Sequence, residues 1–122
     1  MEDPHNIKLG KLGEDLATDY LVSKGYTIFE RNWRNHHKEI DIIAFDGEML
    51  VIVEVKTRQT DDFGTPDLAV DRRKQRLLIA ATNAYIFSHN IDYETRFDII
   101  TVVVKESQEP NIEHLEDAFY PM

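Results

Sequence analysis

The chain has 122 residues, of which 42% are hydrophobic and 30% charged, a composition typical of one soluble globular domain. It has no cysteine, no apolar run near the about 20 residues of a membrane span and no signal peptide, which excludes disulfide and thiolate zinc chemistry and predicts a cytoplasmic protein with no membrane partner. The formal net charge of −9 argues against a protein that simply coats nucleic acid, although an acidic protein can bind phosphates through a local basic face.

The first half of the chain is predicted to contain a helix, a strand and a hairpin. Residues 6–23 have the spacing of an amphipathic helix, and Gly25 follows its end. The helix's expected buried side chains are Leu9, Leu12, Leu16 and Tyr20. Residues 26–33 mix aromatic and β-branched side chains, as strands do. After a polar turn, residues 39–45 and 50–57 are two apolar runs joined by Asp46-Gly47, a strong hairpin signal.

The second half is predicted to contain a helix and a central strand. The helix begins at Pro66-Asp67 and runs to about Phe87. Its expected buried stripe is Leu77, Leu78, Ala81, Ala84 and Tyr85. Residues 97–104 are almost continuously apolar, as in a strand covered on both faces, and 112–115 add a short edge strand.

This element order predicts an α/β fold with a mixed sheet flanked by helices, α-β-β-β-α-β with a weak final strand. We expect one domain over residues 1–122, with a core of about 7–104 and an acidic tail at 105–122.

Charged residues occur on both strands of the predicted hairpin. Because strand side chains alternate in direction, Asp41 shares a face with Ile43, and Glu54 and Lys56 share a face with Ile52. Burial of acids among isoleucines is costly unless something compensates. The alternative is a solvated hairpin face on which these charges simply meet water, and the residue pattern alone leaves both interpretations open.

Hairpin register decides whether the charged residues meet. A two-residue loop leaves Asp41 diagonal to Glu54 and sets Glu39 against Glu54, a like-charge pair. A four-residue loop at residues 46–49 sets Asp41 against Glu54 and Glu39 against Lys56, and we prefer it because unlike charges then meet. A three-residue loop would send the two acids to opposite faces unless a bulge restored the phase.

Two adjacent carboxylates without a full cationic partner repel each other and favour protonation or a bound metal ion. Oxygen ligands without Cys or His suit Mg²⁺ or Mn²⁺. The ammonium of Lys56 projects into the same space, where it could stabilise phosphate charge or orient an attacking water. A hairpin of this kind can therefore hold a divalent metal ion beside a phosphate, with the solvated face as the alternative.

Several motifs in order resemble the bacterial YraN family over about residues 7–104. They are Gly-Lys-Leu-Gly-Glu-Asp-Leu-Ala at 10–17, Glu-Ile-Asp-Ile-Ile-Ala at 39–44, Val-Glu-Val-Lys-Thr-Arg at 53–58, Phe-Gly-Thr-Pro at 63–66, Lys74, and Arg-Phe-Asp at 96–98. The resemblance implies a restriction-endonuclease-like, or PD-(D/E)XK, nuclease fold, similar to that of archaeal Holliday-junction resolvases.

The resemblance also implies a site and a reaction. The implied catalytic residues are Glu14, Asp41, Glu54 and Lys56. The two strand acids and the backbone carbonyl of Val55 would ligate Mg²⁺ (or Mn²⁺). The implied reaction is the hydrolysis of DNA phosphodiesters, in branched or otherwise structured DNA. Ile40 stands where the motif's name has proline, a position at which the family pattern varies.

Further residues are expected to support this site. Glu39 is expected next to the ligands, and Asp98 is expected to orient a neighbouring group rather than bind metal. Five cations are expected to contact nucleic-acid phosphates, although a solvated helix face would also explain those beyond residue 70: Arg58, Arg72, Arg73, Lys74 and Arg76. Paired cuts in a junction would require a homodimer. The alternatives to an endonuclease are a non-catalytic nucleic-acid-binding module and a protein-interaction domain.

Overall fold

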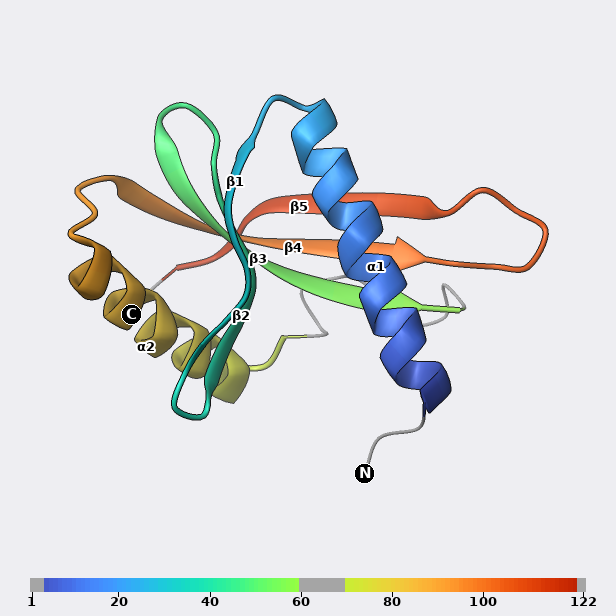
Figure 1. Cartoon of the computed structure of the whole chain (residues 1–122), viewed down its shortest axis with the longest axis horizontal. Helices are drawn as coiled ribbons and strands as arrows, with labels where there is room; N and C mark the ends of the chain where they lie inside the picture. Colours follow the sequence, from blue (N-terminus) through green and yellow to red (C-terminus); the bar gives the residue numbers. More distant parts are fainter. Residues whose placement is uncertain (1–3, 60–69, 121–122) are drawn as a thin grey trace.

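The computed structural model describes residues 4–59 and 70–120 (Figure 1). Its elements, in chain order, are α1 (Pro4–Ser23), β1 (Thr27–Asn35), β2 (Lys38–Phe45), β3 (Met49–Arg58), α2 (Arg72–His89), β4 (Glu94–Val103) and β5 (Asn111–Phe119). The five strands form one sheet in the order β1-β2-β3-β4-β5. All neighbouring strands are antiparallel except β3 and β4, which are parallel. The predicted α/β class with a mixed sheet is confirmed.

The sheet lies between two helices, each of which covers its own apolar cluster. Ala17 and Leu21 of α1 pack on one face, over the inward side chains of β2, β3 and β4. Leu78, Ala81 and Tyr85 of α2 pack on the other face. The two clusters explain why β3 and β4 are almost continuously apolar, since both of their faces are covered. No helix in the described ranges is both long and apolar enough to cross a membrane.

Helix α1 packs closely on the sheet along a buried line of residues that begins at Gly13. A Cβ atom added at Gly13 would overlap the Thr57 side chain of β3, so only glycine allows this approach. The line continues through Ala17 and Leu21, both fully buried. Leu12 lies to one side of this line and is 42% exposed, so its predicted burial was wrong. The helix ends as predicted, with Gly25 in the left-handed region at φ 93°.

The β2–β3 hairpin has the four-residue loop that we preferred. Phe45 pairs with Leu50, and the ladder continues to Ile42 and Val53. The carboxylate of Asp46 accepts the backbone N–H groups of residues 48 and 49, at 3.0 and 2.9 Å, and Gly47 has φ 99°. The side chain at the first loop position thus closes the turn by bonding its own backbone.

Helix α2 begins at Arg72, with Asp71 as its N-cap: the Asp71 carboxylate accepts the backbone N–H of Lys74. The predicted start at Pro66-Asp67 lies outside the described residues. Leu77 is 44% exposed, so its predicted burial was wrong. The predicted burial of Leu78, Ala81 and Tyr85 is confirmed, and Thr82 is buried with them.

The final strand is longer than predicted. β5 extends over nine residues and pairs with β4 from Phe97–Phe119 to Val103–Asn111. Much of the acidic segment after residue 105 therefore belongs to the sheet, with its outward side chains exposed at the edge.

Candidate active site

All four residues predicted as catalytic line one cavity of about 440 Å³, next to the point where the β2–β3 ladder ends. Helix α1 and both hairpin strands contribute to its wall. The lining residues are Leu9, Gly10, Glu14, Asp41, Glu54, Val55, Lys56, Thr57 and Arg58. The cavity thus brings together residues that are up to 49 positions apart in the sequence, Leu9 and Arg58.

Asp41 is the next residue on β2 after the last paired position of the ladder. In the same register its partner would be Glu54, as predicted. The Asp41 carboxylate accepts the backbone N–H of Val55 at 2.9 Å, which fixes the side chain against β3. Burial raises the pKa of Asp41, and this effect outweighs the hydrogen bond from Val55 and the nearby lysine charges, which lower it.

Glu54 is the most buried carboxylate of the cavity, with only 5% of its side chain exposed. Its carboxylate lies 3.4 Å from Lys74 Nζ on α2 and 3.8 Å from Lys56 Nζ on β3. Burial, followed by the charge of Asp41, raises the pKa of Glu54 to about 7 despite both lysines. This glutamate therefore holds its proton more tightly than an exposed glutamate does.

Glu14 enters the cavity from α1, one position after the glycine that packs on Thr57. Burial raises its pKa, and repulsion from Asp41 adds to the increase. Neither Glu14 nor Asp41 forms an ion pair with another described residue. The cavity therefore has three acids, with two ammonium groups that both lie at Glu54.

Asn32 is a residue of this site that sequence reasoning missed. Its side chain donates a hydrogen bond to Glu14, which lowers the pKa of that carboxyl against the larger effect of burial. Asn32 lies on β1 between two residues that pair with Ile42 and Ile40, and so stands beside Asp41. Its φ is 52°, a left-handed conformation that asparagine tolerates better than most residues. That tolerance was the only signal in the sequence.

Glu39 and Lys56 do not form the pair that we predicted. Glu39 Oε2 lies 3.7 Å from Arg34 Nε on β1, and Lys56 turns to Glu54. The prediction was wrong because the ladder ends at Ile42–Val53, so the strands no longer lie opposite each other at residue 39. The charge of Glu39 still contributes to raising the pKa of Asp41 and of Glu14.

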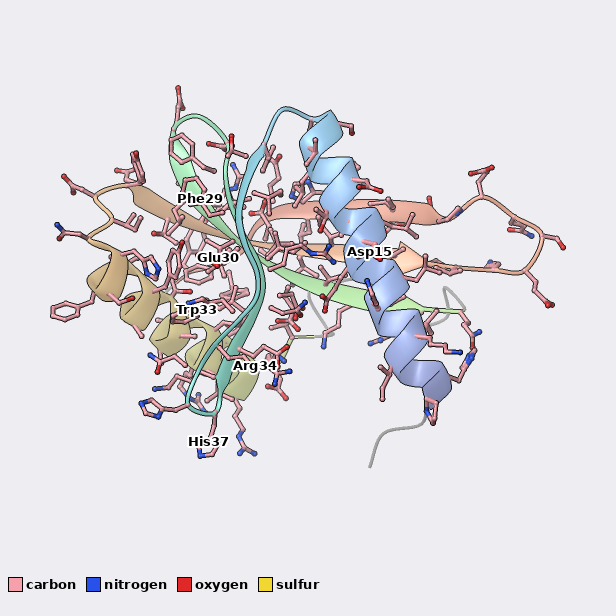
Figure 2. The ribbon with its side chains drawn as sticks, in the orientation of Figure 1. Asp15, Phe29, Glu30, Trp33, Arg34 and His37 are labelled. Carbon is pink, nitrogen blue, oxygen red and sulfur yellow. The ribbon has the colours of Figure 1, made fainter. Side chains whose placement is uncertain are left out.

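A second and wider cavity of about 850 Å³ adjoins the first, because Gly10 and Glu14 line both. Its other lining residues are Ile7, Lys11, Arg31, Asn32, Arg34 and Glu39. Two ion pairs lie at this cavity, Arg31 with Asp15 and Arg34 with Glu39. Figure 2 labels Asp15 on α1 and Arg34 near the β1–β2 turn. The cavity gives the acid site an open approach with cations along its walls.

The five cations predicted to contact phosphates have different surroundings. Arg58 lines the acid cavity, and Lys74 makes an ion pair with Glu54 that the sequence did not suggest. Arg72, Arg73 and Arg76 are exposed on α2 and form no ion pair with any residue in ranges 4–59 and 70–120.

The donors of the acid cavity fit a hydrated, oxygen-liganded metal ion. Within the described part of the chain, no three His, Cys, Asp or Glu side chains are arranged to hold a metal by themselves. Mg²⁺ is commonly held by one or two carboxylates and retains several waters, so Asp41 and Glu54 suffice for it. Burial is the main cause of their raised pKa values, followed for Glu54 by the charge of Asp41, and a bound cation would lower both.

Comparison with known proteins gives the family. A sequence model described as Uncharacterised protein family UPF0102 matches residues 13–102. The chain belongs to this family. The predicted resemblance to the YraN family, which is UPF0102, is thereby confirmed. The matched range includes every residue predicted to be catalytic or to bind metal.

UPF0102 relatives are identical to this chain at about half of the aligned positions, over nearly the whole length of both chains. One from Flavobacterium psychrophilum is 54% identical over 116 residues, which cover 95% of this chain and 96% of the relative. One from Phocaeicola vulgatus is 48% identical, covering 96% and 95%. One from Thermodesulfovibrio yellowstonii is 48% identical, covering 93% and 97%. The similarity to UPF0102 proteins thus extends over the helices and strands that form the acid cavity.

Proposed function

We propose that the protein is a metal-dependent endonuclease that hydrolyses DNA phosphodiesters, with branched or otherwise structured DNA as its substrate. One observation carries the proposal: Glu14, Asp41 and Glu54 converge in a single cavity, each with a raised pKa, next to the ammonium of Lys56. Each of the three acids has a partner that lowers its pKa, but burial and the neighbouring acids outweigh these partners, which is common for carboxylates at functional sites.

The residues of the cavity divide the chemistry among them. Asp41, Glu54 and the Val55 carbonyl would hold Mg²⁺ or Mn²⁺, which when bound would lower the pKa of a water and offset charge on the phosphoryl oxygens. The ammonium of Lys56 would stabilise the charge that develops on the phosphate. Glu14, oriented by Asn32, would hold and orient the attacking water.

The substrate backbone would reach this cavity along the wider one that shares Glu14 with it. Arg31 and Arg34 line that approach, and each is held by an acid at the surface, Asp15 or Glu39. On the other side, Arg58 and the exposed arginines of α2 would contact phosphates. Local cations of this kind would compensate for the net charge of −9.

A panel of DNA forms tests the activity. Single-stranded, duplex, flap and four-way DNA are incubated at low salt with Mg²⁺ or Mn²⁺, and cleavage is followed on gels. We expect at least one form to be cut, and Asp41→Asn and Lys56→Met to reduce the rate about 10³-fold. Glu48→Gln, an exposed acid in the hairpin loop, is the matched control and should cut normally. Absence of cleavage by the wild type, or equal cleavage by the Asp41 and Lys56 variants, would overturn the proposal.

A non-catalytic nucleic-acid-binding module is the second candidate, and the two ion pairs of Glu54 favour it. Lys74 and Lys56 both lie within 4 Å of Glu54, so this part of the site is neutralised without a metal. Calorimetric titration with Mn²⁺ separates the two candidates. Heat of binding in the wild type but not in Asp41→Asn supports the enzyme. The module is supported if neither binds Mn²⁺ and four-way DNA is still retained. A homodimer, which paired cuts would require, is tested by sedimentation with four-way DNA.

A further inference from the structure

A third cavity, of about 360 Å³, lies between α2 and the end of β5. Figure 1 shows the end of β5 on the same side of the sheet as α2. The cavity combines cationic and aromatic side chains, and its lining residues are Arg72, Gln75, Arg76, Ile79, Phe119 and Tyr120. None of them lines the acid cavity.

Helix α2 connects this third cavity with the acid cavity. Arg72 and Arg76 are one turn apart, so their side chains leave the same side of the helix. Lys74 lies between them in the sequence and leaves a different side, where its Nζ meets the carboxylate of Glu54. The first two turns of α2 thus contribute residues both to the third cavity and to the surroundings of Glu54.

The cations of the third cavity have no partner among the described residues. Arg72 and Arg76 form no ion pair there, whereas Arg31, Arg34 and Arg96 are each paired with an acid. Acids outnumber basic residues 23 to 14 in this chain, so two neighbouring arginines without acids at a cavity are an exception. Two guanidinium groups one turn apart suit a phosphate group.

The aromatic part of the cavity is held in place but open to solvent. Tyr120 is 65% exposed, and its hydroxyl donates to Asp117 Oδ2 at 2.9 Å. Its neighbour Phe119 is buried and stacks on Phe97 with ring centroids 5.0 Å apart. An exposed, tethered ring next to arginines is the arrangement on which unpaired bases stack. Bases inside a duplex are already stacked and cannot use it.

We propose that the third cavity binds one unpaired nucleotide, with its phosphate at Arg72 and Arg76 and its base on Tyr120. The inference rests on the proposed nucleic-acid function and narrows its substrate class: the preferred DNA has a single-stranded nucleotide close to the phosphodiester that is cut. Fully paired duplex lacks the feature that this cavity recognises.

Fluorescence titration without divalent metal tests the inference apart from catalysis. The probe is a duplex with a single-stranded extension that contains 2-aminopurine, and the same duplex without the extension is the reference. We expect the wild type to prefer the extended probe and quench its fluorescence. Tyr120→Ala should lose about tenfold in affinity for the extended probe, and Tyr120→Phe should not. Phe87→Ala removes an exposed ring at the far end of α2 and should behave as the wild type.

The arginines are tested by the salt dependence of the same titration. Arg76→Gln should lower the slope of log affinity against log salt concentration by about one, because one phosphate contact is lost. Circular dichroism verifies that each variant is folded. Equal affinity of wild type and Tyr120→Ala for the extended probe would overturn the inference, even if the wild type cleaves DNA. Tyr120-dependent binding by a protein that cleaves nothing would support the inference and reject the proposed catalysis.

Discussion

Glu54 on β3 and Asp98 on β4 are both buried acids on the central strands, but their pKa values move in opposite directions. The Asp98 side chain is fully buried. It accepts hydrogen bonds from Arg96 Nε at 2.9 Å, His114 Nε2 at 2.7 Å and the backbone N–H of Asp117 at 3.0 Å. Burial alone raises the pKa of Asp98, but these bonds outweigh it, and the net shift is downward.

The partners of Asp98 join several elements. Arg96 also donates to Asp46 in the β2–β3 loop at 3.0 Å and to the Tyr26 hydroxyl at 2.7 Å. His114 of β5 contacts the Tyr20 hydroxyl of α1 at 3.2 Å. The cluster around Asp98 thus ties the hairpin loop, the sheet edge and α1 together, in agreement with the expectation that Asp98 orients its neighbours.

The difference teaches that burial of an acid does not by itself mark a functional site. Asp98 has a donor for each oxygen and stabilises the fold in its charged form. Glu54 has two lysines nearby, but burial and the charge of Asp41 outweigh them, so it gains by losing its charge or by acquiring a further cation. The three predictions that follow test this contrast.

The largest expected effect is opposite changes in stability when each acid is neutralised. Asp98→Asn should lower the free energy of unfolding at pH 8 by about 3 kcal/mol, because Arg96 and His114 lose their buried carboxylate acceptor and Arg96 keeps only Asp46 and Glu116 as acidic partners among the described residues. Glu54→Gln should raise it by about 2 kcal/mol in metal-free buffer, because the amide resembles the protonated acid that the site favours. Urea denaturation measures both. A loss of stability in both variants would contradict the contrast.

The pH dependence of stability should also separate the two acids. The folded chain keeps a proton on Glu54 up to about pH 7, whereas the unfolded chain releases it near 4.5. The folded state therefore binds more protons between these values, and the free energy of unfolding should fall as pH rises, by about 3 kcal/mol from Glu54. The contribution of Asp98 has the opposite sign: it is present at neutral pH and is lost on acidification, as pH falls through its lowered pKa.

Denaturation of wild type and Glu54→Gln from pH 4 to 8 isolates the contribution of Glu54 to the pH dependence of the free energy of unfolding. The difference between the two curves should grow with pH and shrink when Mg²⁺ is added, since a bound cation stabilises the charged form. A difference that is constant with pH would show that Glu54 titrates normally.

The smallest expected effect concerns how α1 positions Glu14. Gly13→Ala should cost about 1 kcal/mol, because its Cβ would overlap Thr57 and displace the helix. Gly10→Ala is the matched control: no atom lies within 4 Å of its added Cβ, so improved helix propensity should stabilise the chain by up to about 1 kcal/mol. NMR titration of the carboxyl groups should show an altered Glu14 and an unchanged Asp98. Equal effects at both glycines would contradict the close packing.

Sequence reasoning identified the parts of the site that depend on local order. The Asp46-Gly47 loop and the preference for opposed unlike charges gave the correct register, and strand alternation then placed Asp41 near Glu54. The same reasoning wrongly continued the β2–β3 pairing to Glu39 and Lys56, because the preference for unlike charges opposite each other does not say where two strands separate.

Contacts between distant elements could not be predicted. The ion pair of Lys74 with Glu54 depends on how α2 lies across the sheet, and no local pattern specifies that. The contact of Asn32 with Glu14 depends on the left-handed backbone of Asn32 within β1, a conformation that an asparagine side chain permits but does not require. The exposure of Leu12 follows from the rotation of α1 that Gly13 allows, which only the packed structure determines.

The spacing of two residues on helix α1 limits where the chains of this family can differ in length. It brings Glu14 to the acid cavity and Tyr20 to the cluster around Asp98, at a fixed interval of six residues. One inserted residue would turn these side chains about 100° relative to each other and separate them by about 1.5 Å more. Insertions and deletions between positions 14 and 20 are therefore incompatible with keeping both contacts, whereas the β4–β5 connection can change length without moving either residue.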